Sequence, residues 1–318
     1  MSWTSVVDVL TSRLNDFTYS VWVPPVEEFL APQNFDCHAM HRWVRSNQYA
    51  TPVAAVIAYL LAIFVVLPLV RWRQRSAVPA AMKHLFALWN LLLSLFSGYG
   101  VYVCAPFVWR MISEKGMRYA VCSDDMMLGG TAGDEHAACY GTVGFMMTLF
   151  MLSKLPELLD TVFLVVMHKD VLFLHWYHHV TVLMYSWFAY HNATPSAVVF
   201  GTMNYCVHSV MYFYFFASQY TKAFGFLRKP ITSIQLMQMV LGVSITAFAY
   251  VYENDAGNAE TPCSRTYKDS GFYLFCFVLY GSYLLLFAKL YYDSYIKKSR
   301  GGGKKEISTS ANTIKKRK

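Results

Sequence analysis

The chain has 318 residues, of which 56% are hydrophobic and only 14% are charged. Soluble domains carry about 25% charged residues, so this composition excludes an ordinary soluble enzyme. The mean hydropathy of +0.32 instead indicates a polytopic membrane protein. Nine of the 27 Lys and Arg residues behind the net charge of +8 lie after residue 296, so the charge does not indicate nucleic-acid binding.

Seven apolar stretches follow one another along the chain. Each is long enough for a membrane helix, which needs about 20 mostly apolar residues. They cover 52–70, 85–109, 138–167, 172–190, 197–218, 231–252 and 272–292. We therefore expect an all-α membrane protein with an N-terminal segment (1–51), a seven-helix membrane domain (52–292) and a basic, disordered tail (293–318).

The distribution of Lys and Arg predicts the orientation of the chain. One set of connections, together with the tail, carries more of them than the other set. Because Lys- and Arg-rich connections face the cytosol, the N-terminus is expected in the lumen and the C-terminus in the cytosol. Lys315 and Lys316 occupy the positions of a dilysine retrieval signal, which predicts the endoplasmic reticulum membrane.

Cys122 and Cys263 fall in the two long loops that are expected in the lumen. An oxidising compartment would permit a disulfide between them, and two free thiols are the alternative.

The third apolar stretch is interrupted by charged residues in "SKLPELLDT". Lys154, Glu157 and Thr161 would share one helical face, with Asp160 close to it. Ionisable residues inside membrane helices usually face the protein interior and mark functional sites. A structural ion-pair cluster around the break at Pro156 is the alternative to a catalytic or substrate-binding cluster.

Three further polar groups follow in the next three stretches. The spacing of HxxHH predicts that its histidines share one face of the fourth stretch. In the fifth, an asparagine, a histidine, a methionine and a tyrosine share a face, and in the sixth a hydroxyl and two amides repeat every three residues. These groups are His175, His178 and His179; Asn204, His208, Met211 and Tyr212; and Thr232, Gln235 and Gln238.

Clustered histidines predict either a metal site or covalent chemistry. Membrane di-iron sites use more histidines than the five that can converge here, which are His168, His175, His178, His179 and His208. A single zinc held by three histidines and an acid stays open. In the covalent alternative, a neutral imidazole attacks a thioester and carries the acyl group as an acyl-imidazole.

Taken together, the motifs resemble those of the ELO family of fatty-acid elongases, the membrane 3-ketoacyl-CoA synthases. KxxExxDT, HxxHH, NxxxHxxMYxYY and TxxQxxQ occur in this order between Ser153 and Gln238. The third motif includes Tyr214 but ends in Phe215 instead of tyrosine, which removes one hydroxyl. The stretch Phe173–Trp187 looks most like the branch that elongates saturated and monounsaturated chains.

The resemblance implies a seven-helix fold in which six helices enclose an acyl tunnel open to the cytosol. It implies that acyl-CoA and malonyl-CoA condense to a 3-ketoacyl-CoA two carbons longer, releasing CO2 and CoA, with no metal and no other cofactor. The expected partners are these two substrates, the lipid bilayer, the ketoacyl reductase, dehydratase and enoyl reductase of the cycle, and a second copy of the chain.

Our mechanistic hypothesis is that His178 is acylated and that His208 assists it as a base or as a second covalent contact. The remaining expected catalytic residues are His175, His179, Asp160, Glu157, Lys154 and Asn204. The expected substrate-binding residues are Thr161, Met211, Tyr212, Tyr214, Thr232, Gln235 and Gln238. The alternatives are a metal-dependent membrane oxidoreductase and a seven-helix receptor or transporter.

Overall fold

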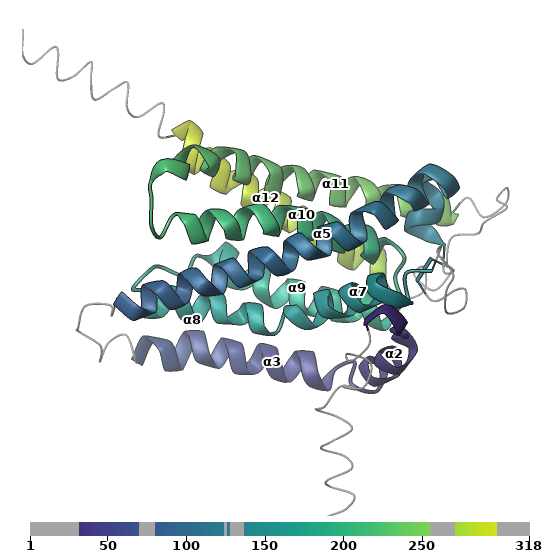
Figure 1. Cartoon of the computed structure of the whole chain (residues 1–318), viewed down its shortest axis with the longest axis horizontal. Helices are drawn as coiled ribbons and strands as arrows, with labels where there is room; N and C mark the ends of the chain where they lie inside the picture. Colours follow the sequence, from purple (N-terminus) through teal and green to yellow (C-terminus); the bar gives the residue numbers. More distant parts are fainter. Residues whose placement is uncertain (1–31, 70–79, 124–125, 128–136, 255–270, 298–318) are drawn as a thin grey trace, which may run out of the picture.

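The computed structural model describes residues 32–69, 80–123, 126–127, 137–254 and 271–297. The regular elements in these ranges are helices, most of which run along the long axis of the molecule (Figure 1). An isolated bridge between Asp36 and Tyr140 is the only β-type pairing in the described ranges. The all-α prediction is therefore confirmed.

The seven expected stretches are helical, and a shorter helix precedes them. The helices are α2 (Cys37–Ser46), α3 (Ala50–Leu61, continued by η3, Ala62–Val66), α5 (Ala80–Cys122), α7 (Gly141–Ser153), α8 (Leu159–Val166), α9 (Phe173–His191), α10 (Ser196–Ala217), α11 (Arg228–Asn254) and α12 (Phe272–Tyr291). The short turns are η2 (Pro32–Asn34), η4 (Pro156–Leu158), η5 (Ala223–Leu227) and η7 (Tyr292–Ile296).

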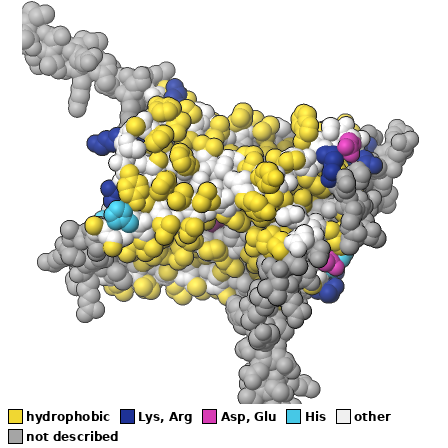
Figure 2. Space-filling view, viewed as in Figure 1, with side chains coloured by type: hydrophobic (Ala, Val, Ile, Leu, Met, Phe, Trp, Pro, Cys, Tyr) yellow, Lys and Arg dark blue, Asp and Glu magenta, His cyan; other side chains and the backbone are white. Residues whose placement is uncertain are grey.

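Four of the described helical segments are long and apolar enough to cross a membrane: Ala50–Leu69, Ala80–Cys122, Ala223–Tyr252 and Phe272–Ile296. Hydrophobic side chains cover the face seen in Figure 2, while charged side chains gather at its two ends. Large exposed residues such as Leu95, Leu274 and Leu285 lie on these helices. This distribution suits a protein surrounded by lipid and wetted only at its ends.

The helices outside this group of four are the ones that carry most of the polar motif residues. The helix pair α7 and α8 holds KxxExxDT, α9 holds HxxHH, and α10 holds Asn204 and His208. The same side chains that form the candidate site therefore lower the hydropathy of the segments that contain them.

The break in the third stretch has a local cause. Pro156 has no backbone N–H and its ring clashes with the preceding turn, so it cannot continue a helix. Accordingly α7 ends at Ser153, a 3-10 turn follows, and α8 begins at Leu159. Lys154 and Glu157 therefore lie in the break, while Asp160 and Thr161 lie on α8.

Helix α5 is much longer than the expected stretch 85–109. It runs to Cys122, with a non-helical Gly116 at φ +85°. It packs closely on α10, because a Cβ at Gly100 would lie 2.6 Å from the ring of Tyr205. Glycine is thus required at this crossing, where α5 supports the central part of α10.

One end of the bundle, called the disulfide end below, is held by covalent and capping contacts. Asp36 caps α2 by accepting a hydrogen bond from the His38 N–H at 2.8 Å. Cys37 forms a disulfide with Cys139 at the start of α7, a pairing that the sequence did not predict. Cys122 is also disulfide-bonded, and its expected partner Cys263 lies outside the described residues. The free cysteines of the described ranges are Cys104, Cys206 and Cys276.

The opposite end, called the basic end, carries the N-termini of α5, α9 and α11. Its described basic residues are Lys83, Lys169, Lys222, Arg228, Lys229, Lys289 and Lys297. Most of the expected N-terminal segment and of the tail lies outside the described residues.

Candidate active site

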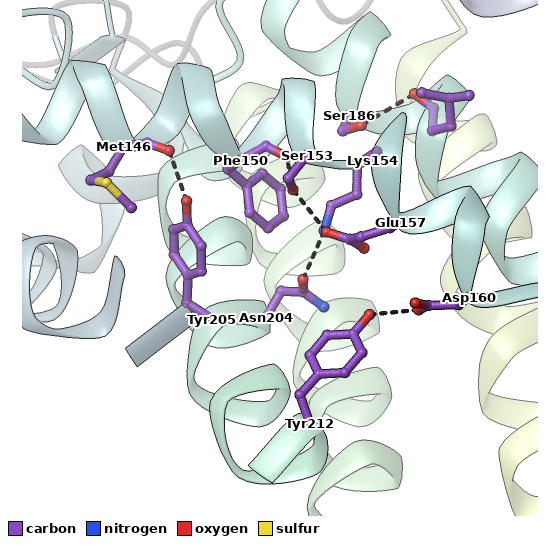
Figure 3. Close-up of polar contacts among 11 residues, drawn as sticks. Met146, Phe150, Ser153, Lys154, Glu157, Asp160, Ser186, Asn204, Tyr205 and Tyr212 are labelled. Atoms are coloured by element: carbon purple, nitrogen blue, oxygen red, sulfur yellow. Dashed lines mark hydrogen bonds and ion pairs between the residues drawn. The ribbon is translucent and has the colours of Figure 1, made fainter. Parts of the chain in front are cut away.

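A buried ion pair occupies the break between α7 and α8. Lys154 Nζ donates to both carboxylate oxygens of Glu157, at 2.8 and 3.1 Å. It also donates to Asn204 Oδ1 on α10 at 3.4 Å, and Figure 3 shows Lys154 between these two residues. Ser153 Oγ donates to Glu157, and the ring of Phe150 lies 4.2 Å from Lys154 Nζ. Both charges are therefore compensated, which their burial requires.

Asp160 forms a second polar contact on α8. Its two carboxylate oxygens accept separate hydrogen bonds, from Trp89 Nε1 at 2.6 Å and from the Tyr212 hydroxyl at 2.9 Å. The Tyr212 ring in turn packs edge-on against His208, with the ring centres 5.2 Å apart. Asp160 therefore connects α5 and α10 and fixes the ring beside His208.

Thr161 forms a third contact. Its hydroxyl lies 2.9 Å from His175 Nε2 and 2.6 Å from the Tyr59 hydroxyl on α3. The His175 ring packs on His179, with the centres 4.5 Å apart, and Tyr59 lies on the far side of His179 at 6.4 Å. Two of the three histidines therefore belong to the side of α9 that contacts α3 and α8.

His178 has a different setting from the other two histidines of its motif, although its ring centre lies 5.8 Å from that of His179. It lines a pocket with about 720 Å³ of space free of atoms, part of it open to solvent. Helices α7, α9, α10, α11 and α12 supply nearly all of the wall. All three histidines lie on α9, where His178 lines the pocket while His175 contacts Thr161 and His179 lies near Tyr59.

The wall of the pocket combines a few polar groups with a mainly apolar lining. His178, Asn204 and Gln238 supply polar atoms, and Tyr283 lies beside His178 with its ring centre 5.1 Å away. The Tyr283 hydroxyl is 2.6 Å from Thr181 Oγ1. The rest of the wall is mainly apolar and aromatic, including Met127, Met147, Met151, Tyr185, Tyr190, Ala197, Phe200 and Leu279. Such a lining suits an apolar ligand that carries a polar group.

The remaining expected substrate-binding residues do not line the pocket. Gln235 donates to Met211 Sδ at 3.1 Å, which links α11 to α10. Thr232 bonds to the carbonyl of Arg228 and lies 3.1 Å from the Tyr295 hydroxyl, at the basic end. Tyr214 is half-buried and packs on Phe215. Among the described residues, neither Thr232 nor Tyr214 lines the pocket.

Three aromatic residues at the site were not expected from the sequence. They are Tyr59, Trp89 and Tyr283, from helices that carry none of the four motifs. A tyrosine or tryptophan in an apolar helix is too common to stand out. Its partner on another helix becomes visible only when the helices are packed.

The basic end lies close to the start of this site. Lys169, in the turn between α8 and α9, is held over the Phe86 ring at 5.1 Å, and partial burial lowers the pKa of its ammonium group. Lys83 and His84 at the start of α5 contact Tyr220 beyond α10. Cationic groups thus surround the end of the bundle from which α9 leads to His178.

The described ranges contain one close group of three metal-ligand atoms, from Cys37, His38 and Cys139. Two of these residues share a disulfide, and His38 Nε2 lies 3.1 Å from the Tyr140 hydroxyl. The group lies at the disulfide end, away from the HxxHH motif. Within the described residues, HxxHH contributes no ligand atom to such a group.

The fold and the site define an all-helical membrane protein with a buried polar cluster beside an apolar pocket. The chain belongs to the ELO family, described as the GNS1/SUR4 family, whose pattern matches residues 44–302. It is an enzyme of the elongase class, as the resemblance of its four motifs predicted.

Curated relatives carry the corresponding names. Fatty acid elongase 3 of Trypanosoma cruzi (strain CL Brener) is 36% identical over 277 residues, covering 81% of this chain and 87% of the relative. Very long chain fatty acid elongase 4 of the same organism is 38% identical over 248 residues, covering 77% and 80%. Very long chain fatty acid elongase 6 of Drosophila melanogaster is 38% identical over 211 residues, covering 66% and 62%.

Proposed function

We propose that this protein condenses an acyl-CoA with malonyl-CoA through an acyl-histidine intermediate on His178. The observation that supports this proposal best is that His178, alone among the three motif histidines, lines the apolar pocket. An acyl chain lying in the pocket would hold its thioester beside this imidazole.

In the first half-reaction, an unprotonated ring nitrogen of His178 attacks the thioester carbonyl. The carbon–sulfur bond breaks, and the second ring nitrogen gives up its proton to the CoA thiolate, which leaves as the thiol. His208 lies close enough to His178 for charges on the two rings to interact, and it serves as the base that carries this proton. A neutral acyl-imidazole remains in the pocket.

Asn204 is the proposed donor to the developing oxyanion. Its side-chain oxygen accepts from Lys154, so its amide nitrogen lies on the side away from Lys154 (Figure 3). Asn204 and His178 line the same pocket. A fixed N–H donor at this position stabilises the transition state without reorganisation, which is the largest effect available to a site without strong acids. Lys154 and Glu157 act here by orienting Asn204.

In the second half-reaction, malonyl-CoA loses CO2 and the electrons of the broken carbon–carbon bond form an enolate. The enolate carbon attacks the acyl carbonyl, a new carbon–carbon bond forms, and the carbon–nitrogen bond to His178 breaks. The imidazolate that leaves takes up a proton from water, and the product is a 3-ketoacyl-CoA two carbons longer. Decarboxylation supplies the carbanion, so the step requires no strong base.

The setting proposed for this reaction is the endoplasmic reticulum membrane. Seven spans, six of them around the acyl tunnel, would place the basic end and the C-terminus in the cytosol and the N-terminus and the disulfide end in the lumen. The Cys37–Cys139 bond supports this orientation, since disulfides persist in oxidising compartments. The reductases and the dehydratase of the cycle, and a second copy of the chain, are the proposed protein partners.

The reaction is tested with purified full-length protein in nanodiscs, an acyl-CoA and labelled malonyl-CoA. A labelled 3-ketoacyl-CoA two carbons longer, formed by the wild type and not by His178→Ala, is expected. Loss of acyl-CoA with no labelled product would contradict the proposal. Stoichiometric iron or zinc, whose removal abolished activity, would favour the metal-dependent oxidoreductase, and ligand binding without turnover would favour a receptor or transporter.

A further inference from the structure

Helix α3 supplies no residue to the wall of the pocket in the described structure, yet one of its side chains reaches the histidine motif. Tyr59 is 5% exposed and places its hydroxyl 2.6 Å from Thr161 Oγ1, which lies 2.9 Å from His175 Nε2. Thr161 is fully buried. The three groups form a continuous hydrogen-bonded chain from α3 through α8 to α9.

The direction of the protons in this chain follows from the number of donors and acceptors. In one direction, Tyr59 donates to Thr161 and Thr161 donates to His175 Nε2. In the reverse direction, His175 Nε2–H donates to Thr161 and Thr161 donates to Tyr59. In the reverse direction the end donor is the Tyr59 hydroxyl, whose one hydrogen-bond contact among the described residues is Thr161, whereas in the first direction it is His175 Nδ1–H, which is not among the buried unpaired atoms. An unmatched buried donor carries the full desolvation penalty, so the first direction is favoured.

We propose that Tyr59 and Thr161 form a hydroxyl relay that holds His175 as its Nδ1–H tautomer. With Thr161 donating to Nε2, this nitrogen is unavailable to a proton, and His175 stays neutral. His175 packs on His179 at 4.5 Å, and the two lie on the same helix as His178. The relay therefore keeps the His175 ring uncharged and fixed in place near the acylated histidine.

This inference deepens the proposed function, on which its catalytic consequence rests. Tyr59 is a positioning residue, since it touches neither the pocket nor His178. Removing an orienting partner of a functional histidine lowers activity by about 10-fold to 100-fold. We expect Tyr59→Phe to lower kcat by about 10-fold and to leave the KM values for both CoA substrates unchanged, because the pocket is intact.

The direct test is the tautomer of His175 in full-length protein labelled with ¹⁵N-histidine in nanodiscs. The signals of His175 are identified as those lost in His175→Gln. The wild type is expected to show a protonated Nδ1 and an unprotonated Nε2, and Tyr59→Phe is expected to give a mixture of tautomers. A protonated Nε2 in the wild type, or an unchanged spectrum in Tyr59→Phe, would overturn the relay. This readout does not depend on elongation, so an inactive wild type with the expected tautomer would refute only the proposed function.

Tyr205→Phe is the matched control. Tyr205 is also buried in the bundle, and its hydroxyl donates to the Met146 carbonyl at 2.8 Å, with no contact to His175 (Figure 3). The control should lose stability without altering the His175 signals. If Tyr59→Phe does not fold, Thr161→Ser and Thr161→Val replace it. The serine variant should keep the tautomer and the valine variant should lose it, and the same spectrum for both would overturn the proposal.

A double substitution separates the relay from a general packing effect. Tyr59→Phe combined with Thr161→Val should lower kcat no further than Thr161→Val alone, because both changes interrupt one chain. If the loss of kcat in the double variant equals the product of the losses in the two single variants, Tyr59 acts independently of Thr161, and the inference is overturned.

Discussion

The depth of the pocket sets a limit on the acyl chain. His178 and Tyr190 both line it and lie twelve residues apart on α9, which corresponds to about 18 Å at 1.5 Å per residue. Carbon–carbon bonds of about 1.5 Å at about 111° advance roughly 1.25 Å each, so about 14 bonds fit. We therefore expect acyl-CoA primers of up to about 16 carbons to be elongated efficiently and longer primers poorly.

Two substitutions should move this limit in opposite directions. Met127 lines the pocket from the segment after α5, and Met127→Ala removes about 3 Å of side chain, enough for one more two-carbon cycle. Ala197 lies seven residues, about 10 Å, beyond Asn204 on α10, so Ala197→Phe should stop elongation near 8 to 10 carbons.

The assay is the distribution of products from a series of even-numbered acyl-CoA primers and labelled malonyl-CoA. Met111→Ala is the control, since Met111 is fully buried but does not line the pocket. It should leave the chain-length limit unchanged. If Met127→Ala and Ala197→Phe also leave it unchanged, the acyl chain does not lie along α9 and the pocket is not the tunnel.

Three further predictions concern the groups around the pocket. Asn204→Leu should lower kcat by about 100-fold or more with little effect on KM, because it removes the proposed oxyanion donor. A variant with the kcat and KM of the wild type would show that Asn204 does not donate to the oxyanion. Lys154→Met should lower the free energy of unfolding in detergent by about 3–5 kcal/mol, because it leaves Glu157 buried and unpaired. The double variant Lys154→Met with Glu157→Met should recover most of this stability but not the activity. Replacing Cys37 and Cys139 by serine should cost about 2–4 kcal/mol of stability. The kcat of the folded protein should stay near that of the wild type, because the disulfide lies at the opposite end from the histidine motif, and a large loss of kcat would contradict this separation.

The sequence predicted the helical class, and it singled out most of the polar residues that meet in the candidate site, because the signals are local. Apolar runs require helices in a membrane, and His178, Asn204 and Lys154 stand out against such runs. Their contacts were not predictable, because Pro156 separates α7 from α8 and only the packed helices show which motif histidine lines the pocket.

Contacts between distant helices were missed for a different reason. Tyr59 meets Thr161 across 102 residues, and Cys37 meets Cys139 across an equal separation. Nothing in the local pattern around Tyr59 or Cys37 specifies a partner so far along the chain. Packing of α3 on α8, and of α2 beside the start of α7, creates both pairs.

The account is tested most directly by the intact mass of the full-length protein after incubation with an acyl-CoA alone. A gain of one acyl group is expected, mapped by peptide analysis to His178, absent in His178→Ala and lost when malonyl-CoA is added. The 3-ketoacyl-CoA should appear as the adduct disappears. A wild-type protein that elongates normally without any adduct, or with the acyl group on another residue, would contradict covalent catalysis by His178.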